Sequence, residues 1–175
     1  MNTTFSYGLI LAVTNIVLTL VGFFLGFQTD KMAEGTWFGW LTFAAAIVVT
    51  WLGVKAVREG SADKSLRYGK GVASGFLINL YAGVIGAIYG FIHFTFINPS
   101  FTDYAINLAR QKAGNASDAQ LAAMEKYLRF VYSPTALSIL GIVFTMIIGI
   151  ILAMIVSAFL KREPPAALEE APPAV

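Results

Sequence analysis

Four apolar stretches, each long enough to cross a lipid bilayer, constrain the fold of this chain more than any other feature. They run from about residue 5 to 27, 37 to 57, 71 to 97 and 135 to 160. At a rise of about 1.5 Å per residue, about 20 residues of α-helix cross the hydrocarbon core. None of the stretches alternates with a period of two, as the strands of a membrane barrel do. The sequence therefore predicts an all-α fold, an integral membrane bundle of four transmembrane helices.

The composition agrees with a chain surrounded by lipid and excludes several classes of site. Hydrophobic residues make up 57% of the 175 residues and charged residues 13%, about half the share in soluble domains. The chain has no cysteine, which excludes disulfides, thiolate chemistry and cysteine-based metal sites. Its basic residues form no concentrated face of the kind that binds nucleic acid. We therefore expect no nucleic-acid partner, and no motif predicts a cofactor, a metal ion or a catalytic group.

The connection between the third and fourth stretches, residues 98–134, is long and amphipathic. Ser117 followed by Gln120 has the pattern of a capping box at a helix start. Pro134 suits the first turn of the fourth stretch, where proline is tolerated. We expect two short amphipathic helices that lie on the membrane surface or across the bundle, either as a simple cap or as a functional element.

The chain divides into a membrane domain, residues 1–162, and a tail, residues 163–175. Prolines, acids and alanines dominate the tail, and such a composition is typical of disordered segments. We predict that the tail has no fixed structure.

The distribution of basic residues predicts the orientation in the membrane. With four spans, seven Lys and Arg residues fall on the face that carries both termini, namely Lys55, Arg58, Lys64, Arg67, Lys70, Lys161 and Arg162. The opposite face carries five, namely Lys31, Arg110, Lys112, Lys126 and Arg129. Because basic residues close to helix ends are retained in the cytoplasm, both termini are predicted to be cytoplasmic. The predicted location is a bacterial inner (cytoplasmic) membrane.

Small residues recur at helical spacing in the third and fourth stretches. Helices in lipid associate through such residues because they let two backbones approach closely. The candidate packing residues are Gly71, Gly75, Gly86 and Gly90 in the third stretch and Gly141, Gly149 and Ala153 in the fourth. They favour close packing between these two stretches; alternatively, one row forms the face of a homo-oligomer or contacts a protein partner.

The third stretch is also the most polar of the four. Its candidates for the lining of an intramembrane site are Asn79, Tyr81, Tyr89 and His93, although packing accounts for them equally well. His93 is the only histidine, so a hydrogen-bonded histidine near the membrane surface is favoured over a metal ligand. No Asp, Glu, Lys or Arg lies deep within any stretch, which counts against a proton-coupled or ion-coupled transporter.

Several short motifs, taken in order, resemble the domain-of-unknown-function 4199 family of small bacterial membrane proteins. They are Tyr7-Gly8, Gly53-Val54-Lys55 with Arg58-Glu59, Tyr68-Gly69-Lys70, the run Asn98-Pro99-Ser100-Phe101-Thr102-Asp103-Tyr104, Tyr132-Ser133-Pro134 and Leu160-Lys161-Arg162. The resemblance extends from about Tyr7 to Arg162. It implies four spans with a long helical loop between the third and fourth, and it implies no activity and no functional residues.

The sequence favours a non-enzymatic accessory or structural membrane subunit, because small-residue rows are abundant and no catalytic constellation is present. A first alternative is a small transporter or a lipid-binding or small-molecule-binding protein, with its site between the third and fourth stretches. A second alternative, a membrane-embedded enzyme, is less favoured.

Overall fold

The computed structural model describes residues 2–163 and is all-helical. The elements in chain order are α1 (Thr3–Phe24), the 3₁₀ turn η1 (Glu34–Phe38), α2 (Gly39–Glu59), α3 (Tyr68–Ile92), the π-helical turn η2 (His93–Ile97), α4 (Phe101–Lys112), α5 (Asp118–Val131) and α6 (Pro134–Leu160). The predicted all-α fold, with shorter helices between the third and fourth long ones, is confirmed. The predicted disordered tail lies outside the described residues, apart from Glu163.

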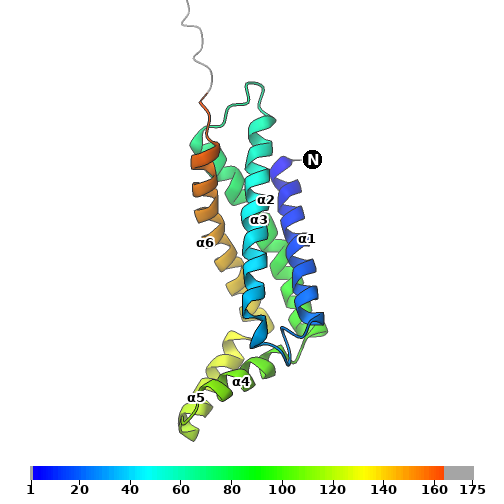
Figure 1. Cartoon of the computed structure of the whole chain (residues 1–175), viewed down its shortest axis with the longest axis vertical. Coiled ribbons are helices and arrows are strands. Elements are labelled where there is room, and N and C mark those ends of the chain that lie inside the picture. Colours follow the sequence, from blue (N-terminus) through cyan, green and yellow to red (C-terminus); the bar gives the residue numbers. More distant parts are fainter. Residues whose placement is uncertain (1, 164–175) are drawn as a thin grey trace, which may run out of the picture.

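Four helices, α1, α2, α3 and α6, form an elongated bundle (Figure 1). Each is long and apolar enough to cross a membrane, which places the chain in a lipid bilayer. α3 packs against the other three, most extensively against α6. We call the end of the bundle where α1 begins and α6 ends the terminal end. The opposite end, which leads into α4 and α5, is the hairpin end.

At the hairpin end α1 is shorter than the predicted first span, whereas the third span keeps its predicted end at Ile97. α1 ends at Phe24 rather than near residue 27, because Gly26 has a φ of +83°, a left-handed conformation that stops a helix. α3 continues to Ile97 through η2, in which the Asn98 N–H donates to the His93 carbonyl at 2.7 Å. The change from α-helix to π-helix therefore begins at His93.

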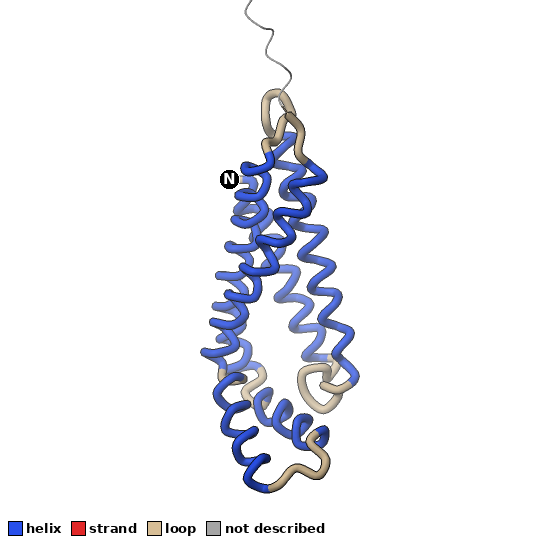
Figure 2. Tube along the Cα trace, turned by 90° about the vertical axis from the view of Figure 1, so that its left-hand side faces the viewer, coloured by secondary structure: helices blue, strands red, loops and turns tan. Residues whose placement is uncertain are grey.

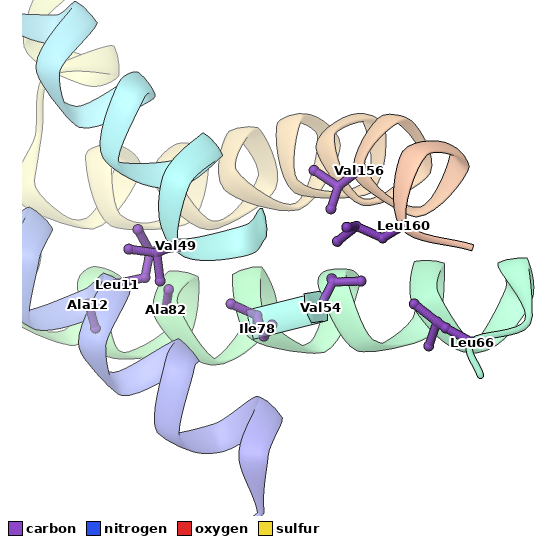
Figure 3. Close-up of a cluster of buried hydrophobic side chains, with 9 residues drawn as sticks. All are labelled: Leu11, Ala12, Val49, Val54, Leu66, Ile78, Ala82, Val156 and Leu160. Carbon is purple, nitrogen blue, oxygen red and sulfur yellow. The ribbon is translucent and has the colours of Figure 1, made fainter. Parts of the chain in front are cut away.

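The buried hydrophobic core occupies the terminal half of the bundle (Figure 3). Its members are Leu11, Ala12, Val49, Val54, Leu66, Ile78, Ala82, Val156 and Leu160. They come from the first half of α1, the second half of α2, the segment from Leu66 to Ala82 and the last turns of α6. Toward the hairpin end the four helices diverge (Figure 2). The bundle is therefore closely packed at one end and more open at the other.

Glycines permit the close approach of α3 and α6. A Cβ added at Gly75 would lie 2.7 Å from the Cβ of Ala153, and a Cβ added at Gly149 would overlap the side chain of Asn79. Real carbon atoms do not approach so closely, so a larger residue at either glycine would push the helices apart. Because glycine has no side chain, it allows the backbones of two helices to approach closely in lipid.

A pair of backbone hydrogen bonds joins the end of α6 to the α2–α3 connection. The Leu66 N–H donates to the Arg162 carbonyl at 2.8 Å, and the Arg162 N–H donates to the Leu66 carbonyl at 3.0 Å. Leu66 itself is buried in the core. The bridge brings together at the terminal end two segments that are both rich in Lys and Arg.

α4 and α5 form a helical hairpin beyond the hairpin end (Figures 1 and 2). The Ser117 side chain accepts from the Gln120 N–H and the Gln120 side chain accepts from the Ser117 N–H, so the predicted capping box at the start of α5 is confirmed. Pro134 lies in the first turn of α6, as predicted. The Thr102 hydroxyl donates to the Tyr132 carbonyl at 2.8 Å, which ties the start of α4 to the end of α5.

Ion pairs hold the two helices of the hairpin together. Arg129 of α5 lies 3.0 Å from Asp103 of α4 and 2.9 Å from Glu125, and Arg110 of α4 also pairs with Glu125. The hydrogen bond from Arg129, helped by the charge of Arg110, lowers the pKa of Glu125. Because the pKa of Glu125 is lowered in the folded state, its carboxylate stabilises the hairpin at pH values above the ordinary glutamate pKa. This stabilisation is lost as the pH falls through the lowered pKa.

We therefore expect the α4–α5 hairpin to loosen in acid, below the ordinary glutamate pKa of about 4.3. Because the chain has no cysteine, spin labels on Asn107→Cys and Ala122→Cys would report the distance between the two helices. The distance distribution should broaden in acid, and Glu125→Gln should broaden it at neutral pH. Asp118→Asn, which removes no ion pair of the described residues, should leave it narrow; equal effects of the two substitutions would contradict the interpretation.

Candidate functional site

The hairpin half of the bundle contains a cavity of about 650 Å³ bounded by all four long helices. Its wall is mainly apolar, with Leu11, Ala46 and Ile148 among the lining residues. The polar lining consists of amides and hydroxyls, namely Asn15, Thr36, Thr42, Asn79 and Thr145. A volume in the range of about 300–1,000 Å³, a mainly apolar wall and a few polar groups are the usual properties of a small-molecule site.

Aromatic side chains mark the mouth of this cavity. Trp40 and Phe43 of α2 and Phe144 of α6 line it, and all three are also exposed on the outside of the bundle. A side chain that faces both the cavity and the surroundings lies at an opening. The larger cavity therefore opens sideways between α2 and α6, toward the lipid.

Asn79 closes the larger cavity toward the core. It is 2% exposed, and its Nδ2 donates to the Thr50 hydroxyl at 3.0 Å and to the Gly75 carbonyl at 2.9 Å. The bond to Thr50 joins α3 to α2 across the bundle. Such interhelical bonds contribute about 1 kcal/mol in membranes, so Asn79 both fixes the helix pair and presents a polar group to the cavity.

A smaller cavity of about 230 Å³ lies between α1, α3 and α6, also toward the hairpin end. Asn15 and Thr145 line both cavities, so the two spaces adjoin at these residues. The Oδ1 atom of Asn15 is buried and has no hydrogen-bond partner among residues 2–163. An unpaired buried carbonyl is costly, and this oxygen is too deeply buried to contact a molecule in either cavity unless the Asn15 side chain moves.

The predicted packing residues divide between the two halves of the bundle. Gly75, Gly149 and Ala153 lie in the close α3–α6 contact, and a Cβ added at Gly71 would lie 2.7 Å from the Ser157 Oγ. Three others line the smaller cavity instead, namely Gly86, Gly90 and Gly141. A Cβ added at Gly86 or Gly141 would meet no atom within 4 Å, and one at Gly90 only the Ser138 Oγ at 3.9 Å. These three glycines were expected to pack between α3 and α6, and they do not because the two helices are farther apart at this level.

A buried hydrogen-bond network surrounds His93 at the hairpin end. The Gln28 Nε2 donates to the Thr19 carbonyl at 2.9 Å, which directs the Gln28 Oε1 to the His93 Nε2 at 2.8 Å. Because Oε1 only accepts, the His93 Nε2 carries the proton and its Nδ1 accepts from the Tyr89 hydroxyl at 3.1 Å. His93 is 0% exposed. The network ties the α1–α2 connection to the end of α3.

The four residues predicted as a common polar lining do not form one site. Asn79 faces the larger cavity and Tyr89 the smaller one. Tyr81 packs on α1, where its ring contacts Phe5 edge-on at 5.4 Å between centroids. His93 belongs to the buried network, where Tyr89 is the one residue of the other three that it contacts by a hydrogen bond. They separate because residues 79 to 93 extend along more than three helical turns and therefore lie at different depths in the bundle.

Other residues of the site were not predicted from the sequence. Asn15 and Thr145 stand out only as polar groups in the middle of the first and fourth stretches, and Gln28 belongs to a short turn. Their roles depend on contacts between helices that are distant in sequence. Among residues 2–163 no group of three or more His, Asp or Glu residues has the arrangement of a metal site.

Comparison with known proteins identifies a family for the chain. Residues 6–162 match the model of a family described as "protein of unknown function (DUF4199)". No curated protein and no solved structure matches the chain. The matched range includes α1 from residue 6 onward, the other three long helices and the α4–α5 hairpin. The chain therefore belongs to the DUF4199 family, as its motifs indicated.

Proposed function

We propose that this protein is a non-enzymatic membrane protein that binds a lipid-like amphiphile in the larger cavity. The observation that carries the proposal is a cavity of about 650 Å³, inside the membrane-spanning bundle, that opens sideways between α2 and α6. A molecule dissolved in the bilayer reaches such a mouth without crossing water. Binding is favoured over catalysis because the polar lining offers amides and hydroxyls and no acid–base pair.

The apolar wall suits an acyl or similar chain. Leu11, Ala46 and Ile148 surround the inner part of the cavity, and the rings of Phe43 and Phe144 flank its mouth. In a membrane an apolar ligand gains little from leaving lipid, since lipid is equally apolar. Retention therefore depends on shape and on the few polar groups, Asn15 and Asn79 in particular.

Filling the cavity tests the proposal. Ala46 lines the larger cavity, whereas Ala44, two residues away on the same helix, is exposed and does not. Ala46→Phe should reduce the amount of co-purified lipid, measured by native mass spectrometry, by at least about tenfold, equivalent to about 1.4 kcal/mol. The matched variant Ala44→Phe should retain lipid as the wild type does. Equal retention by the two variants, or no retained lipid in the wild type, would reject the proposal.

The same measurement separates this proposal from the accessory-subunit hypothesis. That hypothesis stays a prediction, and it requires a stable protein partner or a defined oligomer in the spectrum. A partner bound equally well by the wild type and Ala46→Phe, without retained lipid, would favour it.

We also propose that both termini are cytoplasmic, in a bacterial inner membrane. Support comes from the basic residues of the α2–α3 connection and the end of α6, which the Leu66–Arg162 bridge brings together. Since the chain has no cysteine, single substitutions report sidedness. Asn115→Cys should react with a membrane-impermeant maleimide in intact spheroplasts, and Ala62→Cys only after permeabilisation. The reverse pattern would invert the orientation.

A further inference from the structure

We propose that the smaller cavity receives the hydroxyl-bearing, uncharged head group of an amphiphile whose chain lies in the larger cavity. The inference rests on the proposed function and specifies its ligand. Asn15 and Thr145 line both cavities, so the two spaces adjoin at these residues. In this proposal the ligand passes between the Asn15 and Thr145 side chains, and the smaller cavity, of about 230 Å³, has room for a small head group.

Three hydroxyls of the smaller cavity already donate their protons within the protein, whereas the Thr145 hydroxyl and the Asn15 Nδ2 donate to no group among residues 2–163. The Thr19 hydroxyl donates its proton to the Asn15 carbonyl at 2.8 Å, and the Ser138 hydroxyl donates to the Pro134 carbonyl at 2.8 Å. The Tyr89 hydroxyl donates to the His93 Nδ1, as derived above. Each oxygen keeps lone pairs but has no further proton to give.

These groups favour a head group that both donates and accepts hydrogen bonds. A hydroxyl group supplies the donors that these oxygens need. A phosphate or carboxylate needs a positive charge to balance it, and the lining contains no Lys or Arg. A quaternary ammonium group has no N–H to donate, and the lining contains no acid to balance its charge. A glycerol-type head group with free hydroxyls fits; a charged phospholipid head group does not.

The glycines of α3 and α6 create the space for this head group. Gly86 and Gly141 have open space where a Cβ would lie, so a side chain there would project into the cavity without displacing the backbone. Gly69, in the first turn of α3 at the terminal end, is equally open and lies outside both cavities. Gly69 therefore offers a matched control.

Two probes with the same oleoyl chain test the inference. One is 1-monooleoylglycerol, with two free hydroxyls, and the other is its diacetate, which has no donor. The wild-type protein in detergent should bind the first about tenfold more tightly, as expected for one or two hydrogen bonds in a low-dielectric site. Gly141→Leu should reduce this preference to about twofold or less while the diacetate still binds, and Gly69→Leu should keep it. Ser138→Ala, a smaller change to the same helix, should lower the affinity for monooleoylglycerol alone.

The outcomes distinguish the two proposals. If the wild type binds both probes equally and Ala46→Phe abolishes both, the larger cavity binds chains but the head-group assignment is wrong. If Gly141→Leu and Ser138→Ala leave a tenfold preference unchanged, the hydroxyls bind elsewhere and the inference is overturned. If neither probe binds the wild type, the proposed function fails and the inference fails with it.

Discussion

Replacing Gly149 by alanine is expected to lower the free energy of unfolding by about 1–3 kcal/mol. The added Cβ would overlap the side chain of Asn79, which is buried and held by Thr50 and the Gly75 carbonyl. Asn79 cannot turn away without breaking these bonds, so α3 and α6 must separate. The loss then includes contacts along the whole close-packed half of the pair. Unfolding by SDS in mixed micelles, followed by circular dichroism, measures the change.

Gly141→Ala is the matched control on the same helix. Its added Cβ would meet no atom within 4 Å, and alanine is the better helix former by up to about 1 kcal/mol. The stability should therefore stay unchanged or rise slightly. Equal destabilisation by the two substitutions would show that α3 and α6 are packed alike along their whole length, which contradicts the divergence of the helices.

Replacing His93 by alanine is expected to cost about 3 kcal/mol, the second large effect. The ring is fully buried, and both of its nitrogens are hydrogen-bonded. Truncation would leave a cavity next to Phe23 and Phe94, whose rings contact it edge-on, and would leave the Gln28 Oε1 without a donor. Tyr89→Phe, which removes one hydrogen bond only, should cost about 1 kcal/mol.

Phe96→Ala controls for the loss of a ring from the same π-helical turn. Phe96 is 73% exposed, so its truncation should change the free energy of unfolding by about 0.5 kcal/mol or less. The same SDS titration compares the three variants. A similar cost for His93→Ala and Phe96→Ala would show that the Gln28–His93–Tyr89 network does not hold the hairpin end together.

The properties that the sequence predicts well are those that depend on one segment and its solvent. The number of spans follows from apolar length, since each span must satisfy its own backbone hydrogen bonds in lipid. Two local predictions are also confirmed, the capping box of Ser117 and Gln120 and the position of Pro134 at the start of α6. Both could be predicted because each depends on residues within one helical turn.

The candidate site depends on how the helices diverge, and no local pattern reports this. The rows of small residues on α3 and α6 have the same spacing throughout, yet Gly75 and Gly149 lie in close contact while Gly86 and Gly141 border a cavity. Gln28, in a turn 65 residues before His93, completes the network around it. These are long-range contacts, set by crossing angles and by the turn at Gly26.

Apolar length and local hydrogen-bonding patterns are therefore enough to predict the all-helical membrane bundle, its four spans and the amphipathic hairpin, because bilayer thickness and local hydrogen bonding act on each segment separately. Which small residues pack, which leave space and which polar groups meet follow from the three-dimensional arrangement of the helices. The physical reason is that a glycine offers the same surface in either case. Whether a neighbouring helix occupies the space beside it depends on the packing of the whole bundle.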